Sequence, residues 1–333
     1  MKKHFFVFLT ALAAVMTSSC KKENDALDNP NGPWSVELMA ECESTGSYDN
    51  KFMIELAGTG TVTIDWGDGT VLKDFRMPEL KEEYCEENGE EWYEYEGTKY
   101  AHVYDKSGTY SVKIYGQDGA IVFLGVGVRD ANAPSISGGD FSSLVLNHCG
   151  WLQYFNCMEN RLTTLDISKC IQLKELYCGG NLLTSLDVSK NTQLEELSCW
   201  NNELTSLDVS KNMQLKVLYC DENQLTSLDV SKNTQLEGLE CDRNQLTSLD
   251  VSKNTQLAWL SCNNNQLTSL DISKNRQLKG LYCYGNRIPV VVMNKIYNDL
   301  PVVGQWEGAI FVDRDTAGDY HIAENKGWIV YVE

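Results

Sequence analysis

Apolar and polar positions recur with a step of 21 residues along the second half of the chain. The repeated frame is L-x-x-L-x-C-x-x-N-x-L-T, as in residues 194–205 (LEELSCWNNELT). A period of 20–29 residues with this leucine spacing predicts a leucine-rich-repeat solenoid, in which each coil buries its apolar face by stacking on its neighbours. The pattern gives seven coils over residues 144–290, and the coil that begins at Leu144 is degenerate. Function in such a protein is expected on a surface built by repetition.

Positions that stay constant from coil to coil predict the core. They include a leucine in each strand, an asparagine at the turn that follows, and one cysteine per coil: Cys157, Cys178, Cys199, Cys220, Cys241, Cys262 and Cys283. Zinc sites use C-x₂₋₄-C pairs from two segments, and this spacing provides none. Disulfide geometry also disagrees with side chains that stack in parallel about 4.8 Å apart. The cysteines are therefore interpreted as a structural ladder of buried thiols, and no metal or cofactor is expected.

Positions that vary between coils predict the functional surface. Residues on either side of the inward leucine and cysteine project to the opposite side of the strand, which is the concave face of a solenoid. Tyrosine and tryptophan on such a face are typical of protein-binding hot spots and of sugar-stacking platforms. The candidate binding residues are Tyr154, Tyr177, Trp200, Tyr219, Asp221, Glu240, Asp242, Trp259, Tyr282 and Tyr284.

The repeat resembles internalin J-like bacterial proteins, which are cell-surface leucine-rich-repeat proteins with 21-residue coils and a cysteine ladder. The residues that carry the resemblance are runs such as LEELSCWNNELTSLDVSKN at 194–212, and the resemblance covers about residues 144–290. It implies a surface adhesin or interaction protein without naming the ligand. The N-terminus and the anchor of this chain depart from the pattern of that family.

The first twenty residues predict export and lipidation. Lys2 and Lys3 precede an apolar run that ends in Thr17-Ser18-Ser19-Cys20, a secretory signal too short to span a bilayer. Cysteine after small residues resembles a bacterial lipobox, so residues 1–19 are expected to be a signal peptide and Cys20 the lipidated N-terminus. Polar residues 21–33 are expected to form a flexible tether, and the acidic residues after Cys20 resemble the export signals of Bacteroidetes surface lipoproteins. The expected location is the outer membrane, facing outward.

Residues 34–130 show short alternating runs bounded by Gly, Asp and Ser, which predict a small β-sandwich. The motifs DWGDGT at 65–70, HVY at 102–104 and GTYSV at 108–112 resemble the PKD family of immunoglobulin-like domains, which usually act as spacers or contact modules. Two interpretations of Asp65 and Asp68 are open, a calcium site and turn chemistry around Gly67 and Gly69; the latter is preferred.

A strongly acidic and aromatic stretch interrupts this pattern at residues 79–96 (ELKEEYCEENGEEWYEYE). It is interpreted as a solvated loop, with a contact surface around Trp92 as the alternative. Cys42 and Cys85 form a candidate disulfide in an oxidising compartment. Cys149 and Cys170, at equivalent places on adjacent coils, form another.

The repeat ends after Ile288. Residues 290–300 have helical spacing, and residues 308–312 and 327–331 are expected to be strands around a helical turn. The expected organisation is therefore a signal peptide (1–19), a tether (20–33), a PKD-like sandwich (34–130), a linker and N-terminal cap (131–143), the solenoid (144–290) and an α+β cap (291–333). A cap covers the core and sheet edge that a solenoid would otherwise expose.

The net charge of the chain limits the classes of molecule that it is expected to bind. Its 333 residues contain 28 Lys and Arg against 47 Asp and Glu, a formal net charge of −19, which disfavours nucleic acid and anionic membrane surfaces. No catalytic motif such as G-x-S-x-G or H-E-x-x-H is present, so an enzyme is not expected. The leading hypothesis is a surface lipoprotein that contacts the membrane only through its lipid and binds a protein on a host or bacterial surface. Glycan capture is the alternative, and a structural envelope protein is the third.

Overall fold

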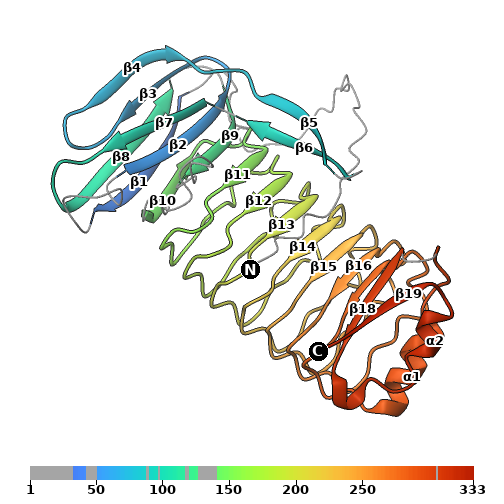
Figure 1. Ribbon diagram of the computed structural model, residues 1–333. Coiled ribbons are helices and arrows are strands. Elements are labelled where there is room, and N and C mark those ends of the chain that lie inside the picture. Colours follow the sequence, from blue (N-terminus) through green and yellow to red (C-terminus); the bar gives the residue numbers. More distant parts are fainter. Residues whose placement is uncertain are drawn as a thin grey trace.

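The structure is a computed structural model that describes residues 33–42, 51–87, 90–96, 98–116, 120–126, 141–304 and 307–333. Side chains at 41, 42, 51 and 82–96 lie outside that description. A β-sandwich stands at one end of the molecule, a helical cap at the other, and a stack of parallel coils joins them (Figure 1). The expected fold class is confirmed.

The seven coils contribute one short strand each to a parallel sheet, in register from coil to coil. Leucine or phenylalanine in the middle of each strand is buried in the core. The residues on either side of it lie on the opposite side of the sheet, because side chains alternate along a strand. The strands are β11 (Tyr154–Asn156), β12 (Glu175–Tyr177), β13 (Glu196–Ser198), β14 (Val217–Tyr219), β15 (Gly238–Glu240), β16 (Trp259–Ser261) and β17 (Gly280–Tyr282).

Asparagine side chains join neighbouring coils. In a representative coil, Asn202 Oδ1 accepts the backbone N–H of Leu183 at 3.0 Å, and Nδ2 donates to the carbonyl oxygens of Cys178 and Cys199 at 3.1 Å. The side chain of this asparagine thus satisfies backbone groups of its own coil and of an adjacent one. An unpaired buried backbone group would cost about 1–3 kcal/mol, so each amide stabilises the stack.

The sandwich is built from two sheets, and one of them is the end of the solenoid sheet. The five-stranded sheet has the order β10 (Phe141–Asn147), β1 (Trp34–Cys42), β8 (Gly108–Gly116), β3 (Thr61–Asp65), β4 (Val71–Arg76). The other layer is β9 (Ile121–Val126), β2 (Lys51–Gly58) and β7 (Thr98–Val103). A separate hairpin consists of β5 (Lys81–Glu87) and β6 (Glu90–Glu96).

Strand β9 is the point at which the two domains become one sheet. It pairs antiparallel with β2 and parallel with the first coil strand β11, so a single sheet of twelve strands runs from β7 to β19. Strand β10, which contains the predicted start of the degenerate coil at Leu144, pairs with β1 of the sandwich. The side chain of Asn160 strengthens the junction, because Oδ1 accepts the N–H of Phe141 and Nδ2 donates to the carbonyl of Val126. The sandwich thereby closes the N-terminal end of the solenoid core.

The C-terminal cap continues the sheet and covers its core. Helix α1 (Val290–Asp299) buries Met293, Ile296 and Tyr297. Two more parallel strands, β18 (Gly308–Val312) and β19 (Trp328–Val332), extend the ladder, with a 3₁₀ turn (Arg314–Thr316) and α2 (His321–Glu324) between them. The helix and both strands match the positions expected from the sequence. In the described part of the chain, no helix combines the length and the apolar character needed to cross a membrane.

Candidate functional site: the concave face of the sheet

The structure places the predicted binding residues on the solvent-facing side of the parallel sheet, which we call the concave face. Three columns of side chains run along it: one before the inward leucine, one before the ladder cysteine and one after it. Nine of the ten candidate residues are partly exposed there: Tyr177, Trp200, Tyr219, Asp221, Glu240, Asp242, Trp259, Tyr282 and Tyr284.

Tyr154 differs from the other nine candidates. It is only 8% exposed and packs with Phe123 and Ala57 in a small apolar cluster on the concave side of the junction with the sandwich. The ammonium group of Lys174 lies 6.0 Å from the centre of its ring. Tyr154 therefore stabilises the junction, and the accessible part of the concave face begins at β12.

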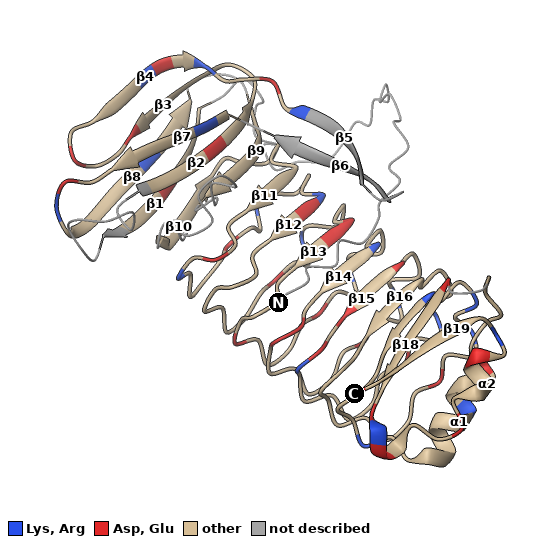
Figure 2. Cartoon of the chain, viewed as in Figure 1, with Lys and Arg blue, Asp and Glu red and all other residues tan. Residues whose placement is uncertain are grey.

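Two glutamates and a tyrosine follow on β12 and β13, where Figure 2 shows acidic positions side by side. Tyr177 Oη donates to Glu175 Oε2 at 2.9 Å. Burial raises the pKa of Glu175 to about 7, against the lowering effect of the Tyr177 hydrogen bond. Burial and the nearby Glu175 carboxylate raise the pKa of Glu196 to about 8. Carboxyl groups with a pKa raised in this way are poorly solvated and lack a strong cationic partner.

A second acidic group occupies β14 and β15 and the residues that follow them. Burial, followed by repulsion from Asp242, raises the pKa of Asp221 to about 7. Burial raises the pKa of Glu240 to about 8, and the neighbouring Asp221 and Asp242 add to the effect. Asp242 is better satisfied, because Ser261 Oγ donates to it at 2.8 Å and the N–H of Asn263 at 2.7 Å; burial nevertheless raises its pKa to about 6.

An aromatic row crosses the C-terminal part of the concave face. Trp259 leans on Tyr282 with ring centres 4.9 Å apart, Tyr282 stacks on Phe311 at 4.1 Å, and Phe311 stacks on Tyr331 at 4.4 Å. Tyr331, at the end of the row, is 43% exposed. Phe311 and Tyr331 were not among the candidate residues, because they lie outside the 21-residue repeat. Strand alternation over residues 308–312 and 327–331 indicates on which side of the sheet they lie, but their alignment with Tyr282 depends on the register of the cap strands.

Both tryptophans of the concave face occupy space that a glycine on an adjacent coil leaves open. A Cβ atom at Gly280 would lie 2.1 Å from Cε3 of Trp259, and one at Gly179 would lie 2.3 Å from Nε1 of Trp200. Each indole is thus held against the backbone of its neighbour. At these two places, the residues on adjacent coils therefore limit each other's size.

The cysteine ladder lies beneath this surface, in the core. All seven ladder cysteines are buried free thiols, and burial raises their pKa, to about 12 for Cys283. The thiols of Cys220, Cys241 and Cys262 each donate to a carbonyl oxygen on the next coil at 3.4 Å. Cys149 and Cys170 are buried thiols as well, so the structure does not join them as a disulfide. Within the described residues, no group of three or more His, Cys, Asp or Glu is arranged to hold a metal ion.

The aspartates of the DWGDGT motif form turns. Asp65 Oδ1 accepts the N–H of Gly67 at 2.9 Å, and Asp68 Oδ1 accepts the N–H of Thr70 at 2.9 Å. His102 Nε2 lies 2.7 Å from Asp68 Oδ2. Gly67 and Gly69 have φ of 81° and 97°, which residues with a Cβ atom rarely adopt. These contacts support the turn interpretation over a calcium site.

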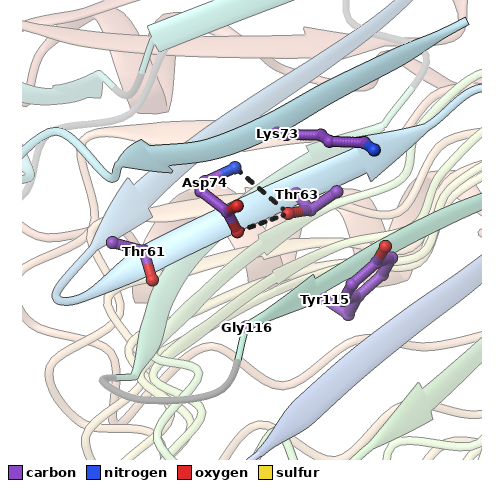
Figure 3. A pocket seen from close by; sticks show the side chains of 6 residues that line it. All are labelled: Thr61, Thr63, Lys73, Asp74, Tyr115 and Gly116. Atoms are coloured by element: carbon purple, nitrogen blue, oxygen red, sulfur yellow. Dashed lines mark hydrogen bonds between the residues drawn. The ribbon is translucent and has the colours of Figure 1, made fainter.

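A shallow hollow lies on the outer face of the sandwich, between β3, β4 and β8 (Figure 3). Thr63 Oγ1 donates to Asp74 Oδ1 at 3.3 Å, and the N–H of Asp74 donates back to Thr63 Oγ1 at 3.2 Å. The polar groups of Thr63 and Asp74 at the centre of the hollow thus hydrogen-bond to one another, and we assign no ligand to the hollow. Its lining residues are Thr61, Thr63, Lys73, Asp74, Tyr115 and Gly116.

Several sequence predictions fall outside the described residues. Cys20 and the signal peptide precede residue 33, and the side chains of Cys42, Cys85 and Trp92 are among those not described. Lipidation, the Cys42–Cys85 disulfide and the acidic-aromatic contact surface stay predictions.

Comparison with known proteins finds partial likenesses among solved structures. The functional domain of InlJ from Listeria monocytogenes, which includes a cysteine ladder, is 42% identical over 45% of this chain and 33% of that chain, with a TM-score of 0.44. A leucine-rich-repeat protein of Leptospira interrogans is 27% identical over 49% of this chain and 43% of that chain, with a TM-score of 0.46. An internalin, InlF of Listeria monocytogenes, is 18% identical over 56% of this chain and 51% of that chain, with a TM-score of 0.45.

The chain thus spans about a third to a half of the length of these structures. No protein-family model and no curated protein matches the sequence. Because the three TM-scores lie below 0.5, the assignment of the fold rests on the coils themselves.

Proposed function

We propose that this protein is a binding module that recognises a protein partner through the concave face of its solenoid, from β12 to the cap. One observation carries the proposal. On every coil strand the inward position is a buried leucine or phenylalanine, whereas the outward positions change from coil to coil and gather aromatic and acidic side chains. Packing of the core explains the residues of the first set, but it does not explain why aromatic and acidic side chains gather in the second.

The kinds of residue on this face support a protein partner. Tyrosine and tryptophan are enriched in hot spots of protein interfaces, where a small number of side chains contributes most of the binding energy. Phe311 lies between Tyr282 and Tyr331, so both faces of its ring are covered and its edge is what remains for a ligand. A sugar ring stacks on the open face of an aromatic ring. The row therefore favours a protein, although Trp200 and Trp259, each held against a glycine, keep glycan capture as the second candidate.

The test compares two triple variants for capture of cell-surface proteins by the purified chain. Changing Tyr219, Trp259 and Tyr282 to alanine removes three outward side chains that do not enter the core. We expect each hot spot to cost about 2 kcal/mol or more in binding, roughly thirtyfold in affinity. The measurement is quantitative capture at several concentrations, with circular dichroism to confirm that the fold is kept.

The matched control changes Thr192, Met213 and Thr234 to alanine. These exposed residues lie in loops of three consecutive coils, each directly after a buried asparagine (Asn191, Asn212 and Asn233). It should bind as the unaltered chain does. Equal capture by both triple variants would place recognition elsewhere on the molecule. Binding to a glycan array that is lost only in the concave-face variant would support the second candidate instead.

We further propose that the chain acts as a lipoprotein on the outer surface of the cell, held by a lipid on Cys20, with the PKD-like sandwich as a spacer. The apolar leader that ends in Thr17-Ser18-Ser19-Cys20 supports this anchoring. Changing Cys20 to alanine removes the thiol that would carry the lipid. We expect the variant to leave the detergent phase for the aqueous phase in a detergent-partitioning experiment, while retention in the detergent phase would refute the anchor.

A further inference from the structure

The last strand of the solenoid sheet has a free edge. Strand β19 pairs with β18 on one side, and no strand in the described part of the chain pairs with its other side (Figure 1). The N–H of Glu333 donates to the carbonyl oxygen of Val312 at 3.0 Å, and the carbonyl oxygen of Glu333 accepts the N–H of Arg314 at 3.0 Å. Because backbone groups alternate in direction along a strand, those of Val330 and Val332 point away from β18. Among the residues that the structure describes, none places a backbone group opposite them.

Apolar side chains at this edge are less well covered than those one strand earlier. On the core side of the sheet, Val312 of β18 is fully buried, whereas Val332, directly opposite it on β19, is 37% exposed. On the concave side, Tyr331 stacks on Phe311 with ring centres 4.4 Å apart and is 43% exposed. A further strand beside β19 would cover apolar surface on both sides of the sheet.

Strand β19 lacks the features that normally block pairing at the edge of a sheet, which are charged residues, proline and bulges. The other edge strands of the two large sheets each have one of these features. Strand β4 contains Lys73, β7 contains Lys99, and the pairing of β10 with β1 shifts register between Met39 and Ala40. Strand β19 (WIVYV) has neither charge nor proline, and its pairing with β18 is regular. Its sequence therefore leaves the edge open to another strand.

The edge of β19 is complementary to itself. When two copies pair antiparallel about a two-fold axis at Tyr331, Val330 of each copy lies opposite Val332 of the other. The outward backbone groups of these valines then exchange hydrogen bonds, and their side chains meet on the core side of the sheet. The two Tyr331 residues form a non-hydrogen-bonded pair, in which side chains approach most closely, so each phenol ring covers the other.

We propose that β19 pairs with β19 of a second copy of this chain and joins the two solenoid sheets into one. A second copy fits this edge because one register satisfies the free backbone groups, covers Val332 and continues the aromatic row through Tyr331. The interface is isologous, as in most soluble oligomers. The dimer presents two concave faces, which strengthens binding to a surface that displays the same partner repeatedly. The inference goes beyond the proposed function and does not depend on it.

Sedimentation equilibrium of the purified full chain tests the interface. Every sample carries Cys20→Ala, so that a lipid cannot drive association, and physiological salt screens the repulsion between two acidic copies. We expect a monomer–dimer equilibrium. Tyr331→Lys places two ammonium groups against each other at the two-fold axis and should weaken dimerisation by about tenfold or more. The matched control is Tyr320→Lys, which makes the same change at a tyrosine of the cap that is 36% exposed and should leave dimerisation unchanged.

Two further variants test the strand pairing itself. Cysteines directly opposite each other in a non-hydrogen-bonded pair lie within reach of a disulfide, so mild oxidation should cross-link Tyr331→Cys but not Tyr320→Cys. Val332→Pro removes an N–H that points away from β18 and should also weaken dimerisation, while the bonds that Glu333 makes to β18 remain. Circular dichroism checks that each variant keeps its fold.

The outcomes separate pairing at this edge from other kinds of association. A chain that stays monomeric at every concentration, or equal dimerisation of Tyr331→Lys and Tyr320→Lys, would overturn the proposal. Unchanged dimerisation of Val332→Pro together with no cross-link in Tyr331→Cys would show that the strands do not pair, and would overturn it as well. A monomeric chain whose Tyr331→Lys variant loses its captured cell-surface protein would assign the edge to that partner in place of a second copy.

Discussion

The two sides of the solenoid sheet differ although the same strands form both. On the inner side, Leu218, Leu239 and Leu260 stack in register at one place in consecutive coils. On the outer side, the same three strands present tyrosine, glutamate and serine before the ladder cysteine. Stacking of identical coils imposes one solution on the inner side, because every coil meets the same neighbour. The outer side has no such requirement and is free to carry recognition.

The outer side nevertheless has rules of its own between adjacent coils. Trp259 fits because Gly280 provides no Cβ atom beside it, and Trp200 fits because of Gly179. At these two places the indole of one coil lies where the adjacent coil has a glycine. The inner side thus keeps the same residue from coil to coil. On the outer side the residues change, and the size of a tryptophan is accommodated by a glycine on the adjacent coil.

Removing part of the inner side should give the largest effect. The double change Cys220→Gly and Cys241→Gly deletes two buried thiols and two hydrogen bonds to the next coil. We expect it to lower the free energy of unfolding by about 2–5 kcal/mol, as for other buried large-to-small changes. Chemical denaturation followed by circular dichroism measures this cost.

Two exposed loop positions, Met213 and Thr234, give the control for that experiment. Met213 is 61% exposed, and its change to alanine together with Thr234→Ala should alter the unfolding free energy by no more than about 0.5 kcal/mol. If the cysteine variant proved as stable as this control, the ladder would have no structural role, and a chemical one would have to be sought.

Adding a methyl group on the outer side should have a smaller effect. Gly280→Ala places a Cβ atom in the space of the Trp259 ring, so the ring must move. We expect a loss of about 1–3 kcal/mol from overpacking. The cost should disappear when Trp259 is already alanine, because the double-mutant cycle isolates the contact between the two. Additive effects of the two changes would contradict the pairing of adjacent coils.

The sequence predicted the parts of the molecule that repeat and the parts that follow simple alternation. Helix α1 and strands β18 and β19 appeared where spacing placed them, and the ladder cysteines are buried. The partnership of β9 with β11 was not predictable, because pairing between a sandwich and a solenoid depends on how their ends meet in space. The burial of Tyr154 follows from that same junction.

The candidate site was predicted in part, for a similar reason. Outward positions could be read from the strand period, which located Trp259 and Tyr282. The continuation of the row through Phe311 and Tyr331 depends on the register between β17, β18 and β19, across connections that do not repeat.

The smallest effect is expected from a single charge on the outer side. The pKa of Glu240 in the folded protein is about 8, above its ordinary value of 4.5. Its contribution to stability is therefore fully present below pH 4.5 and is lost as the pH rises through 8. Glu240→Gln removes the titration. The fall in the free energy of unfolding between pH 5 and pH 9 should therefore be smaller in the variant, by an amount on the order of 1 kcal/mol, and melting temperatures at the two pH values measure it.

Asp208→Asn is the control because its pKa is lowered by hydrogen bonds from Ser210. Its contribution is present above the unfolded pKa and is lost only as the pH falls through the lower folded value, so it should not alter the fall between pH 5 and pH 9. Equal pH dependence in the Gln variant and the unaltered chain would mean that Glu240 is already well solvated, and the outer side would then hold its charges without strain.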